Sequence, residues 1–295
     1  MNNLLEKFKA LLQDPPPEFA FEISADGIAM SRTDGAGAVQ FAALPAGTLK
    51  PNPIAENVVD PVAYAAAVIR LVTAGLRGKR GAALILPDNS IRVAILDFDN
   101  VPDKDEEKRA LIRFRLRKTL PFDVDTSMVS YTMIGPKRVL VAVAPNEIVA
   151  QYEAPFRALG LHPGLVTVSS LAMLELTPLK TSAVIAKLSA GVLTVTALQP
   201  NGILLIRSLD LDPHATDPLD EISDDLYPTL AYIEDNTGAR PERLLIAGFG
   251  DESAAVATRL SVELELPVEA IPEQYPGLAG YLALLPAAFP KKVAA

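Results

Sequence analysis

The chain has 295 residues, of which 49% are hydrophobic, 21% charged and 6% aromatic. This length is enough for about two domains of roughly 150 residues each, and the hydrophobic content excludes a disordered chain. The 36 acidic and 27 basic side chains give a net charge of −9. Because binding to polyanions needs a basic surface, we expect no nucleic-acid partner.

No apolar stretch of the sequence reaches the ~18 to 20 residues that cross a bilayer as a helix. The first residues, MNNLLEKFKALL, lack the charged start, long apolar core and small-residue cleavage site of a secretion signal. Cysteine is absent, which excludes disulfides and thiolate nucleophiles. These features favour a cytoplasmic protein.

The sequence contains none of the common catalytic or cofactor motifs. There is no GxGxxG after a strand, no P-loop, no GxSxG and no HExxH. His162 in GLHPG and His214 in DPHATDP have no partner at the spacing of a metal-binding pair, and we interpret both as loop residues. We therefore expect no catalytic residue and no metal site.

Residues 1–17 form a separate segment, an amphipathic arm followed by a proline linker. The run Pro15–Pro17 ends any helix that precedes it. The arm either docks on its own domain or binds a membrane surface or a partner. Its apolar residues recur at helical spacing: Leu4, Leu5, Phe8, Leu11 and Leu12.

Short strands open the first half of the chain. The segments 19–24, 28–32 and 39–42, separated by glycine-containing turns, predict a three-strand meander. The apolar run 82–86 predicts a strand buried on both faces. Between them, residues 61–74 predict a helix that Gly75 and Gly78 end. Helical spacing predicts its buried face: Val62, Ala65, Ala66, Ile69 and Val72 with Thr73.

The block from about residue 91 to 165 has its own pattern and predicts a compact β-α-β-β-α subdomain. A strand at 91–96 precedes a charged helix at 104–119, which Pro121 ends. The expected elements that follow are strands at 128–134 and 139–144, joined at Gly135-Pro136, and a helix at 146–159.

The second half repeats the opening pattern. Strands at 183–188, 192–199 and 203–208 predict another meander, with Pro200-Asn201-Gly202 as the second turn. We expect residues 210–225 to form a flexible, solvated acidic loop, and Pro228 to confine the next helix to about 226–237. The remaining predicted elements are a short helix at 169–176 before the meander, and after it a strand at 243–247, a helix at 252–264, an edge strand at 268–270 and a helix at 281–288.

Two halves with the same order of elements indicate a duplicated α/β domain. The segments LILPDNSIRVAILDFDNVPDKDEEKRALIRFRLRKTLPFDVD at 84–125 and VLVAVAPNEIVAQYEAPFRALGLHPGLVTVSSLAMLEL at 139–176 resemble, in the order of their elements, the PilM proteins of type IV pilus assembly. These proteins belong to the actin-like superfamily. The resemblance covers roughly residues 19–286 and implies an actin-like, ribonuclease H-like α/β fold with duplicated domains and a small inserted α+β subdomain.

The resemblance also implies a division of the chain into domains. The arm and linker would occupy 1–17, and the first actin-like domain 18–90. The segments 166–182 and 276–290 would complete the first domain. The inserted subdomain would occupy 91–165, and the second actin-like domain 183–275.

PilM-like proteins lie at the cytoplasmic face of the bacterial inner membrane and bind the N-terminal cytoplasmic peptide of the bitopic membrane protein PilN. The type II secretion protein GspL has a similar cytoplasmic domain. The resemblance therefore implies a non-catalytic scaffold, peripheral to the membrane, whose partners are a PilN-like protein and other platform components, with self-association left open. The peptide groove would lie between the first domain and the inserted subdomain. Five apolar residues mark the region that we expect to bind it, with plain core packing as the alternative: Val93, Ile95, Leu116, Leu120 and Phe122.

An actin-like ATPase needs two glycine-rich hairpin turns that approach the phosphates, each with an acidic residue that organises Mg²⁺. Family members with an intact site have Asp-Ile-Gly at these turns. This chain has Glu-Ile-Ser from Glu22 and Lys-Leu-Ser from Lys187, so we expect degenerate turns and no cofactor. Binding of ATP with Mg²⁺ without hydrolysis, and an active ATPase that drives assembly, stay as alternatives. The candidate nucleotide-binding residues are Glu22, Ser24, Asp26, Lys187, Ser189, Gly248 and Gly250.

A basic face is the last feature of the sequence. Arg109, Arg113 and Arg117 recur every four residues in the predicted helix 104–119 and so line one side of it. This side is either a solvated surface or a basic ridge that meets anionic lipid heads or an acidic partner.

Overall fold

The computed structural model describes residues 16–34, 38–72, 80–177 and 181–288. The chain divides into two compact units, with the boundary between Val168 and Ser169. Residues 1–15 of the predicted arm, Thr73, Gly75 and Gly78 lie outside the described residues. The domain division expected from the resemblance, including the completion of the first domain by 166–182 and 276–290, stays a prediction.

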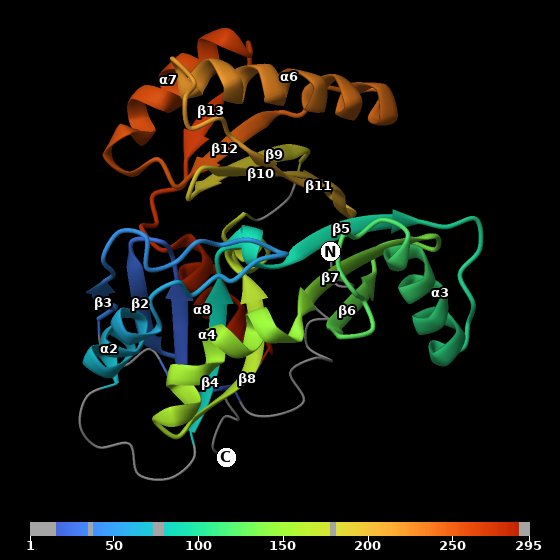
Figure 1. Ribbon diagram of the computed structural model, residues 1–295. Helices are drawn as coiled ribbons and strands as arrows, with labels where there is room; N and C mark the ends of the chain where they lie inside the picture. Colours follow the sequence, from blue (N-terminus) through green and yellow to red (C-terminus); the bar gives the residue numbers. More distant parts are fainter. Residues whose placement is uncertain (1–15, 35–37, 73–79, 178–180, 289–295) are drawn as a thin grey trace, which may run out of the picture. The chain divides into compact units, whose positions relative to one another are not determined.

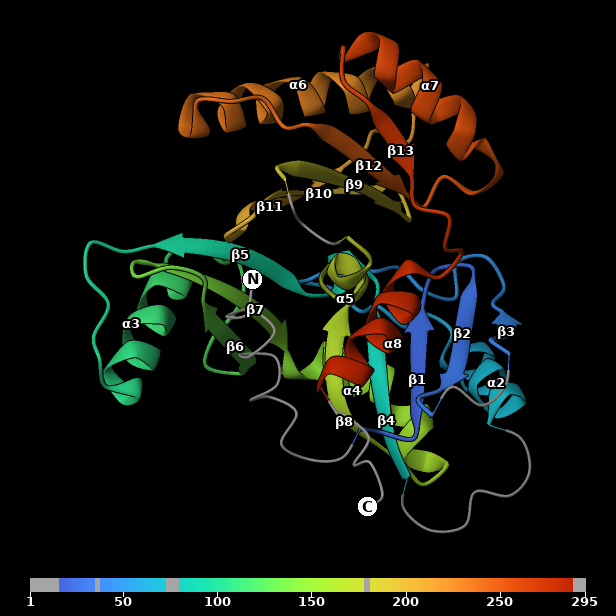
Figure 2. The same ribbon diagram turned by 180° about the vertical axis from the view of Figure 1, so that it is seen from behind.

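The first unit contains a five-stranded sheet in the order β3-β2-β1-β4-β8 (Figure 1). The predicted meander is confirmed, because β1, β2 and β3 pair antiparallel, and β4 and β8 then continue the sheet in parallel. Helices α2 and α4 cover one face of this sheet (Figures 1 and 2). The elements are β1 (Phe19–Ile23), β2 (Gly27–Arg32), β3 (Gln40–Ala43), α2 (Pro61–Leu71), β4 (Arg80–Leu86), α4 (Asn146–Ala158) and β8 (Leu161–Val168).

The buried face of α2 differs from the predicted one. Val62 and Ile69 are 79% and 54% exposed, because the helix turns its aromatic residue inward. The ring of Tyr64 lies edge-on to the ring of Tyr152 on α4, with 6.2 Å between the ring centroids. The buried residues are therefore Tyr64, Ala67, Val68 and Leu71.

Strand β8 was missed in the sequence, and His162 lies on it rather than in a loop. Proline and glycine are atypical of strands, so the GLHPG segment gave no strand signal. Strand β8 lies at the edge of the sheet, where proline is tolerated. Ala82 pairs with Pro163 while Ala83 pairs with Leu165, so Gly164 is an extra residue in a β-bulge. His214 does lie in a loop, and both histidines are exposed.

The inserted subdomain interrupts the connection between β4 and α4. Its three strands form an antiparallel sheet in the order β5-β7-β6, and α3 packs on one face of it (Figure 2). This arrangement confirms the predicted order of elements within 91–165. The elements are η1 (Asp88–Ser90), β5 (Arg92–Asp97), α3 (Asp105–Arg117), β6 (Ser127–Met133) and β7 (Arg138–Pro145).

The second unit repeats the topology of the first. Its sheet has the order β11-β10-β9-β12-β13, in which an antiparallel meander is again followed by two parallel strands. Helices α6 and α7 cover one face (Figures 1 and 2). The elements are α5 (Ser169–Ala172), η2 (Met173–Leu176), β9 (Ala183–Ser189), β10 (Val192–Gln199), β11 (Gly202–Asp210), α6 (Pro218–Thr237), β12 (Arg243–Ala247), η3 (Gly250–Glu252), α7 (Ser253–Glu263), β13 (Val268–Ala270) and α8 (Pro276–Ala288).

Helix α6 starts earlier than predicted and replaces part of the expected acidic loop. Asp217 caps it by accepting a hydrogen bond from the Leu219 N–H at 2.9 Å, and Pro218 takes the first helical position, where a missing N–H has no cost. Pro228 lies inside the helix, because burial of the surrounding apolar residues outweighs one lost backbone hydrogen bond. The prediction of a flexible loop is therefore wrong for residues 218–225.

Candidate functional site

A buried polar network ties the root of the inserted subdomain to the segment that precedes α2. Tyr152 on α4 donates a hydrogen bond to Oδ1 of Asn57 at 3.0 Å, and its hydroxyl lies 2.8 Å from Oγ of Ser90. Oε1 of Gln151 accepts from the Asn57 N–H at 2.8 Å. Because Ser90 lies just before β5 and Tyr152 follows β7, this network fixes both points where the chain enters and leaves the subdomain.

Three of the five residues expected at the peptide groove pack between α3 and the three-stranded sheet. Leu116 is 1% exposed and belongs to the buried core of the subdomain. Leu120 and Phe122, in the segment after α3, pack against the same core and are half-buried. Leu116 therefore has a structural role, while the other two retain accessible surface.

The other two residues of that set lie on the opposite face of the sheet. Leu96 points into the core beneath α3, so Val93 and Ile95, which alternate with it along β5, point away from α3. Val93 lies opposite Ala142 and Ile95 opposite Leu140 on β7. Both are half-buried. They form an apolar pair beside the open edge of β5, which is an end strand of its sheet.

The three arginines of the predicted basic face lie on α3, but they have different partners. Arg117 donates to Oδ1 of Asp125 at 2.6 Å, and this hydrogen bond lowers the pKa of the Asp125 carboxyl. Arg113 donates from Nη1 to the Val124 carbonyl oxygen at 2.7 Å. Arg109 is exposed and forms no hydrogen bond or ion pair with any other residue that the structure describes.

Arg109 and Arg113 line a cavity of about 480 Å³ between α3 and β6. The other lining residues are Ile112 on α3 and Val129, Ser130 and Tyr131 on β6. The cavity therefore combines an apolar floor, two guanidinium groups and the end strand of a sheet. Sequence reasoning identified the two arginines, but the pairing of α3 with β6 depends on tertiary packing.

The first candidate phosphate turn connects β1 and β2. The N–H and the hydroxyl of Ser24 both donate to the Gly27 carbonyl oxygen, at 2.8 and 3.1 Å. Glu22 is only 7% exposed on β1, and Asp26 is exposed at the turn itself. Among the three candidate residues of this turn, Asp26 thus presents the accessible carboxylate.

The second candidate turn is a two-residue hairpin between β9 and β10. Ala190 and Gly191 have φ values of 50° and 76°, and positive φ at both positions is typical of a type I′ turn. Lys187 is 5% exposed on β9 and pairs with Ala247 at the end of β12. The structure therefore brings Lys187, Ser189 and Gly248 to one end of the second sheet, with Gly250 opening η3 nearby in sequence.

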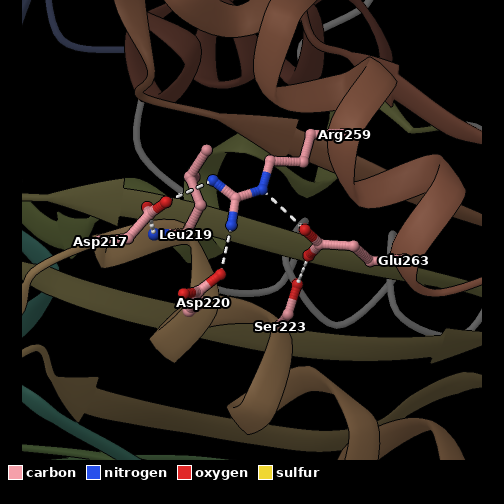
Figure 3. A network of polar contacts seen from close by, with 6 residues as sticks. All are labelled: Asp217, Leu219, Asp220, Ser223, Arg259 and Glu263. Carbon is pink, nitrogen blue, oxygen red and sulfur yellow. Dashed lines mark hydrogen bonds and ion pairs between the residues drawn. The ribbon is translucent and has the colours of Figure 1, made fainter.

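A further polar network, not anticipated from the sequence, joins α6 to α7 (Figure 3). The Arg259 guanidinium donates to Oδ2 of Asp217 at 2.6 Å, to Oε1 of Glu263 at 2.7 Å, and to Asp220. Ser223 donates to the other oxygen of Glu263. The hydrogen bonds from Arg259 lower the pKa of Asp217 and of Glu263. This network anchors the start of α6, so these acidic residues have a structural role.

Within the described parts of the chain, no helix is long and apolar enough to cross a membrane. No group of three or more histidine, aspartate or glutamate side chains among the described residues is arranged to hold a metal ion.

Three solved structures are similar to this chain over most of their length. The PilM-PilN type IV pilus biogenesis complex shares 18% identity over 93% of this chain and 98% of its own, with a TM-score of 0.71. The cytoplasmic domain of EpsL, an inner-membrane component of the type II secretion system of Vibrio cholerae, shares 10% identity over 93% and 95%, with a TM-score of 0.55. A Bacteroides thetaiotaomicron protein with an actin-like ATPase fold and unknown function shares 10% identity over 90% and 94%, with a TM-score of 0.53.

No model of a known protein family and no curated protein sequence matches the chain. The repeated sheet topology of the two units and the similarity to these structures nevertheless indicate the same fold. The resemblance to PilM that the sequence shows is thus confirmed at the level of the fold, and this chain has the duplicated α/β actin-like fold.

Proposed function

We propose that this chain is a scaffold protein of a type IV pilus platform, or of a related type II secretion platform, at the cytoplasmic face of a bacterial inner membrane. In this role it binds the N-terminal cytoplasmic peptide of a PilN-like membrane protein and is held at the membrane by its partners. The observation that carries the proposal is the similarity to PilM over nearly all of both chains, which includes the inserted subdomain.

The apolar pair Val93 and Ile95 supports a peptide contact at β5. Extended peptides bind by adding main-chain hydrogen bonds to an open strand edge while their side chains enter neighbouring apolar pockets. Strand β5 supplies the edge, and the half-buried Val93 and Ile95 supply apolar surface beside it. Leu120 and Phe122, with their remaining accessible surface, are the further contact residues in this proposal.

The two candidate phosphate turns support a scaffold rather than an ATPase. A phosphate turn works by bringing unobstructed backbone N–H groups and a magnesium-organising carboxylate to the nucleotide. The turn between β9 and β10 has a lysine at 187 where an acidic residue is needed, and Ala190 occupies a left-handed position of its tight hairpin. The positive charge of Lys187 therefore disfavours coordination of Mg²⁺, and with it ATP hydrolysis, at this end of the second sheet.

Calorimetric titration with a synthetic peptide tests the proposal. The peptide copies the N-terminal cytoplasmic tail of a PilN-like membrane protein. We expect Ile95→Asp to weaken binding at least about tenfold, because a buried apolar contact is worth more than 1.4 kcal/mol. Val62→Asp is the matched control, since Val62 is 79% exposed on α2. Absence of binding to the unmodified chain would contradict the proposal.

A second titration, with ATP and Mg²⁺, separates the scaffold from the ATPase alternative. We expect no saturable binding and no phosphate release. Tight binding that Glu22→Ala abolishes would instead assign the chain an active nucleotide site.

A further inference from the structure

The cavity between α3 and β6 borders the open edge of a sheet. In the order β5-β7-β6, strand β6 pairs only with β7. Val129 and Tyr131 pack against the core beneath α3, so the side chain of Ser130 points to the opposite face of the sheet. Ser130 nevertheless lines the cavity. The cavity therefore reaches the main chain of β6, where one side of the strand has no partner strand.

Two positively charged side chains, Arg109 and Arg113, line the cavity at this edge. Arg113 is half-buried and is held in place by its hydrogen bond to the Val124 carbonyl oxygen, which leaves most of its five N–H donors for other partners. Arg109 has no polar partner in the described part of the chain. Neither arginine forms a salt bridge with a described residue, so a bound carboxylate could accept charge-assisted hydrogen bonds from both.

We propose that this cavity binds an extended acidic segment of a partner protein. The segment adds to the sheet alongside β6 and places one carboxylate between Arg109 and Arg113. Main-chain hydrogen bonds supply affinity in such complexes, and alternate side chains supply specificity. The volume of about 480 Å³ accommodates a few side chains and is too small for a folded domain.

The residues on the outer face of β6 extend the expected recognition pattern. Met128 is 55% exposed and lies on the face opposite α3, as does Ser130. A strand paired with β6 would alternate its side chains between the arginines and this outer face. The partner segment should therefore alternate acidic residues with apolar ones.

This site is distinct from the peptide contact proposed at β5, because β5 and β6 are the two opposite edges of the sheet. Its chemistry also favours a protein segment over a lipid surface. Arg117 is already paired with Asp125, and Arg113 is half-buried in the cavity wall, so Arg109 is the one exposed arginine of these three without an ion pair to a described residue. The exposed, unpaired charge at the cavity is therefore that of Arg109, and a single basic residue contributes only about 1 kcal/mol to binding of an anionic membrane.

Fluorescence anisotropy with labelled synthetic peptides tests the proposal on the full chain. One probe alternates glutamate with valine, and its control replaces each glutamate with glutamine. We expect the acidic probe alone to bind, and Arg109→Gln to weaken it about fivefold to tenfold, the effect of one partly exposed charge-assisted hydrogen bond. Arg115→Gln is the matched control, because Arg115 lies on the same helix, is exposed and does not line the cavity. The affinity of Arg115→Gln for the acidic probe should stay within about twofold of that of the unmodified chain, because salt screens the long-range attraction between an exposed arginine and the probe.

Hydrogen exchange of the backbone amides reports whether the peptide adds as a strand. The N–H groups of Val129 and Tyr131 point to the open edge of β6, whereas that of Ser130 points to β7. We expect the acidic probe to protect the amides of Val129 and Tyr131, with no added protection at Ser130 or in β5. The proposal is overturned by equal binding of both probes, by equal losses in Arg109→Gln and Arg115→Gln, or by binding without protection of β6. It is also overturned if phosphatidylglycerol vesicles, or a second copy of the chain, bind through Arg109 while the acidic probe does not. None of these outcomes depends on the peptide contact at β5.

Discussion

The carbonyl oxygen of Leu188 occupies the space that a β-carbon on Gly248 would need. Gly248 follows β12, and Leu188 is the penultimate residue of β9, so the close approach joins the end of one strand to the hairpin of its neighbour. The glycine at this position is therefore explained by backbone packing alone. A role in holding a nucleotide is not needed to account for it.

Replacement of Gly248 by alanine should destabilise the second unit strongly. The φ value of Gly248 is 87°, which costs a residue with a β-carbon about 1–2 kcal/mol, and the clash with Leu188 adds to this. We expect a total loss of about 2–4 kcal/mol, measured by urea unfolding. Gly250→Ala is the control, because its φ is 55° and its surroundings are open. Equal losses in the two variants would show that the contact with Leu188 is unimportant.

The Tyr152 hydroxyl should contribute measurably to stability. Tyr152→Phe leaves Oδ1 of buried Asn57 and the hydroxyl of buried Ser90 without this partner, and an unsatisfied buried group costs about 1–3 kcal/mol. The loss should appear as a lower urea midpoint and faster exchange of amides at the root of the subdomain. Tyr227→Phe, at a position 55% exposed on α6, should change stability by less than about 0.5 kcal/mol. An unchanged urea midpoint in Tyr152→Phe would show that this network does not stabilise the attachment of the subdomain.

The Arg259 network should make stability depend on acid pH. Arg259 lowers the pKa of Asp217 and of Glu263 in the folded state, so both carboxylates stabilise the fold above their unfolded pKa values of about 4. This contribution is lost as the pH falls through the lower folded pKa values. We therefore expect Arg259→Gln to reduce the urea midpoint at pH 7 and to approach the unmodified chain below about pH 4. Arg157→Gln, which removes a single ion pair with Glu153 one turn away on α4, should have a smaller effect at both pH values.

Tyr281 should make the free energy of unfolding depend on pH in the alkaline range, where stability is lost as the pH rises. Its side chain on α8 is 2% exposed, and its hydroxyl has no hydrogen-bond partner in the described residues. Burial raises the pKa of Tyr281 from 10.0 to about 12, so the unfolded chain ionises first and the free energy of unfolding falls as the pH rises between these values. Tyr281→Phe should be neutral or stabilising at pH 7 and should remove a slope of about 1.4 kcal/mol per pH unit. A destabilised phenylalanine variant would reveal an unrecognised partner of the hydroxyl.

Sequence patterns predicted the strands well where apolar residues are continuous or end at a clear turn. The run that became β4 and the Pro200-Asn201-Gly202 turn between β10 and β11 are examples, and both are confirmed. Such signals are local, because strand alternation and turn chemistry depend on neighbouring residues. The repeat of the meander was visible for the same reason.

The predictions that failed concern elements whose structure depends on which other element packs against them. Helix α2 is apolar nearly all round, so periodicity could not tell the face of Val62 from the face of Tyr64, and contact with Tyr152 on α4 made the choice. Strand β8 contains Pro163 and Gly164, and it forms because β4 offers a parallel edge on which a bulge accommodates the extra residue. Pro228 was expected to delay α6, but burial of the neighbouring apolar side chains outweighs the lost hydrogen bond.

In the candidate sites, too, some features are visible in the sequence and others depend on tertiary packing. The Lys-Leu-Ser stretch at 187 and the spacing of Arg109 and Arg113 are properties of the sequence alone. Only the tertiary structure placed Val93 and Ile95 on one face of the inserted sheet and Leu116 in its core, and only it joined the two arginines to the open edge of β6. The physical reason is that side-chain type and helical or strand period are fixed along the chain. Which face becomes buried, and which edge stays open, is decided by packing between elements far apart in sequence.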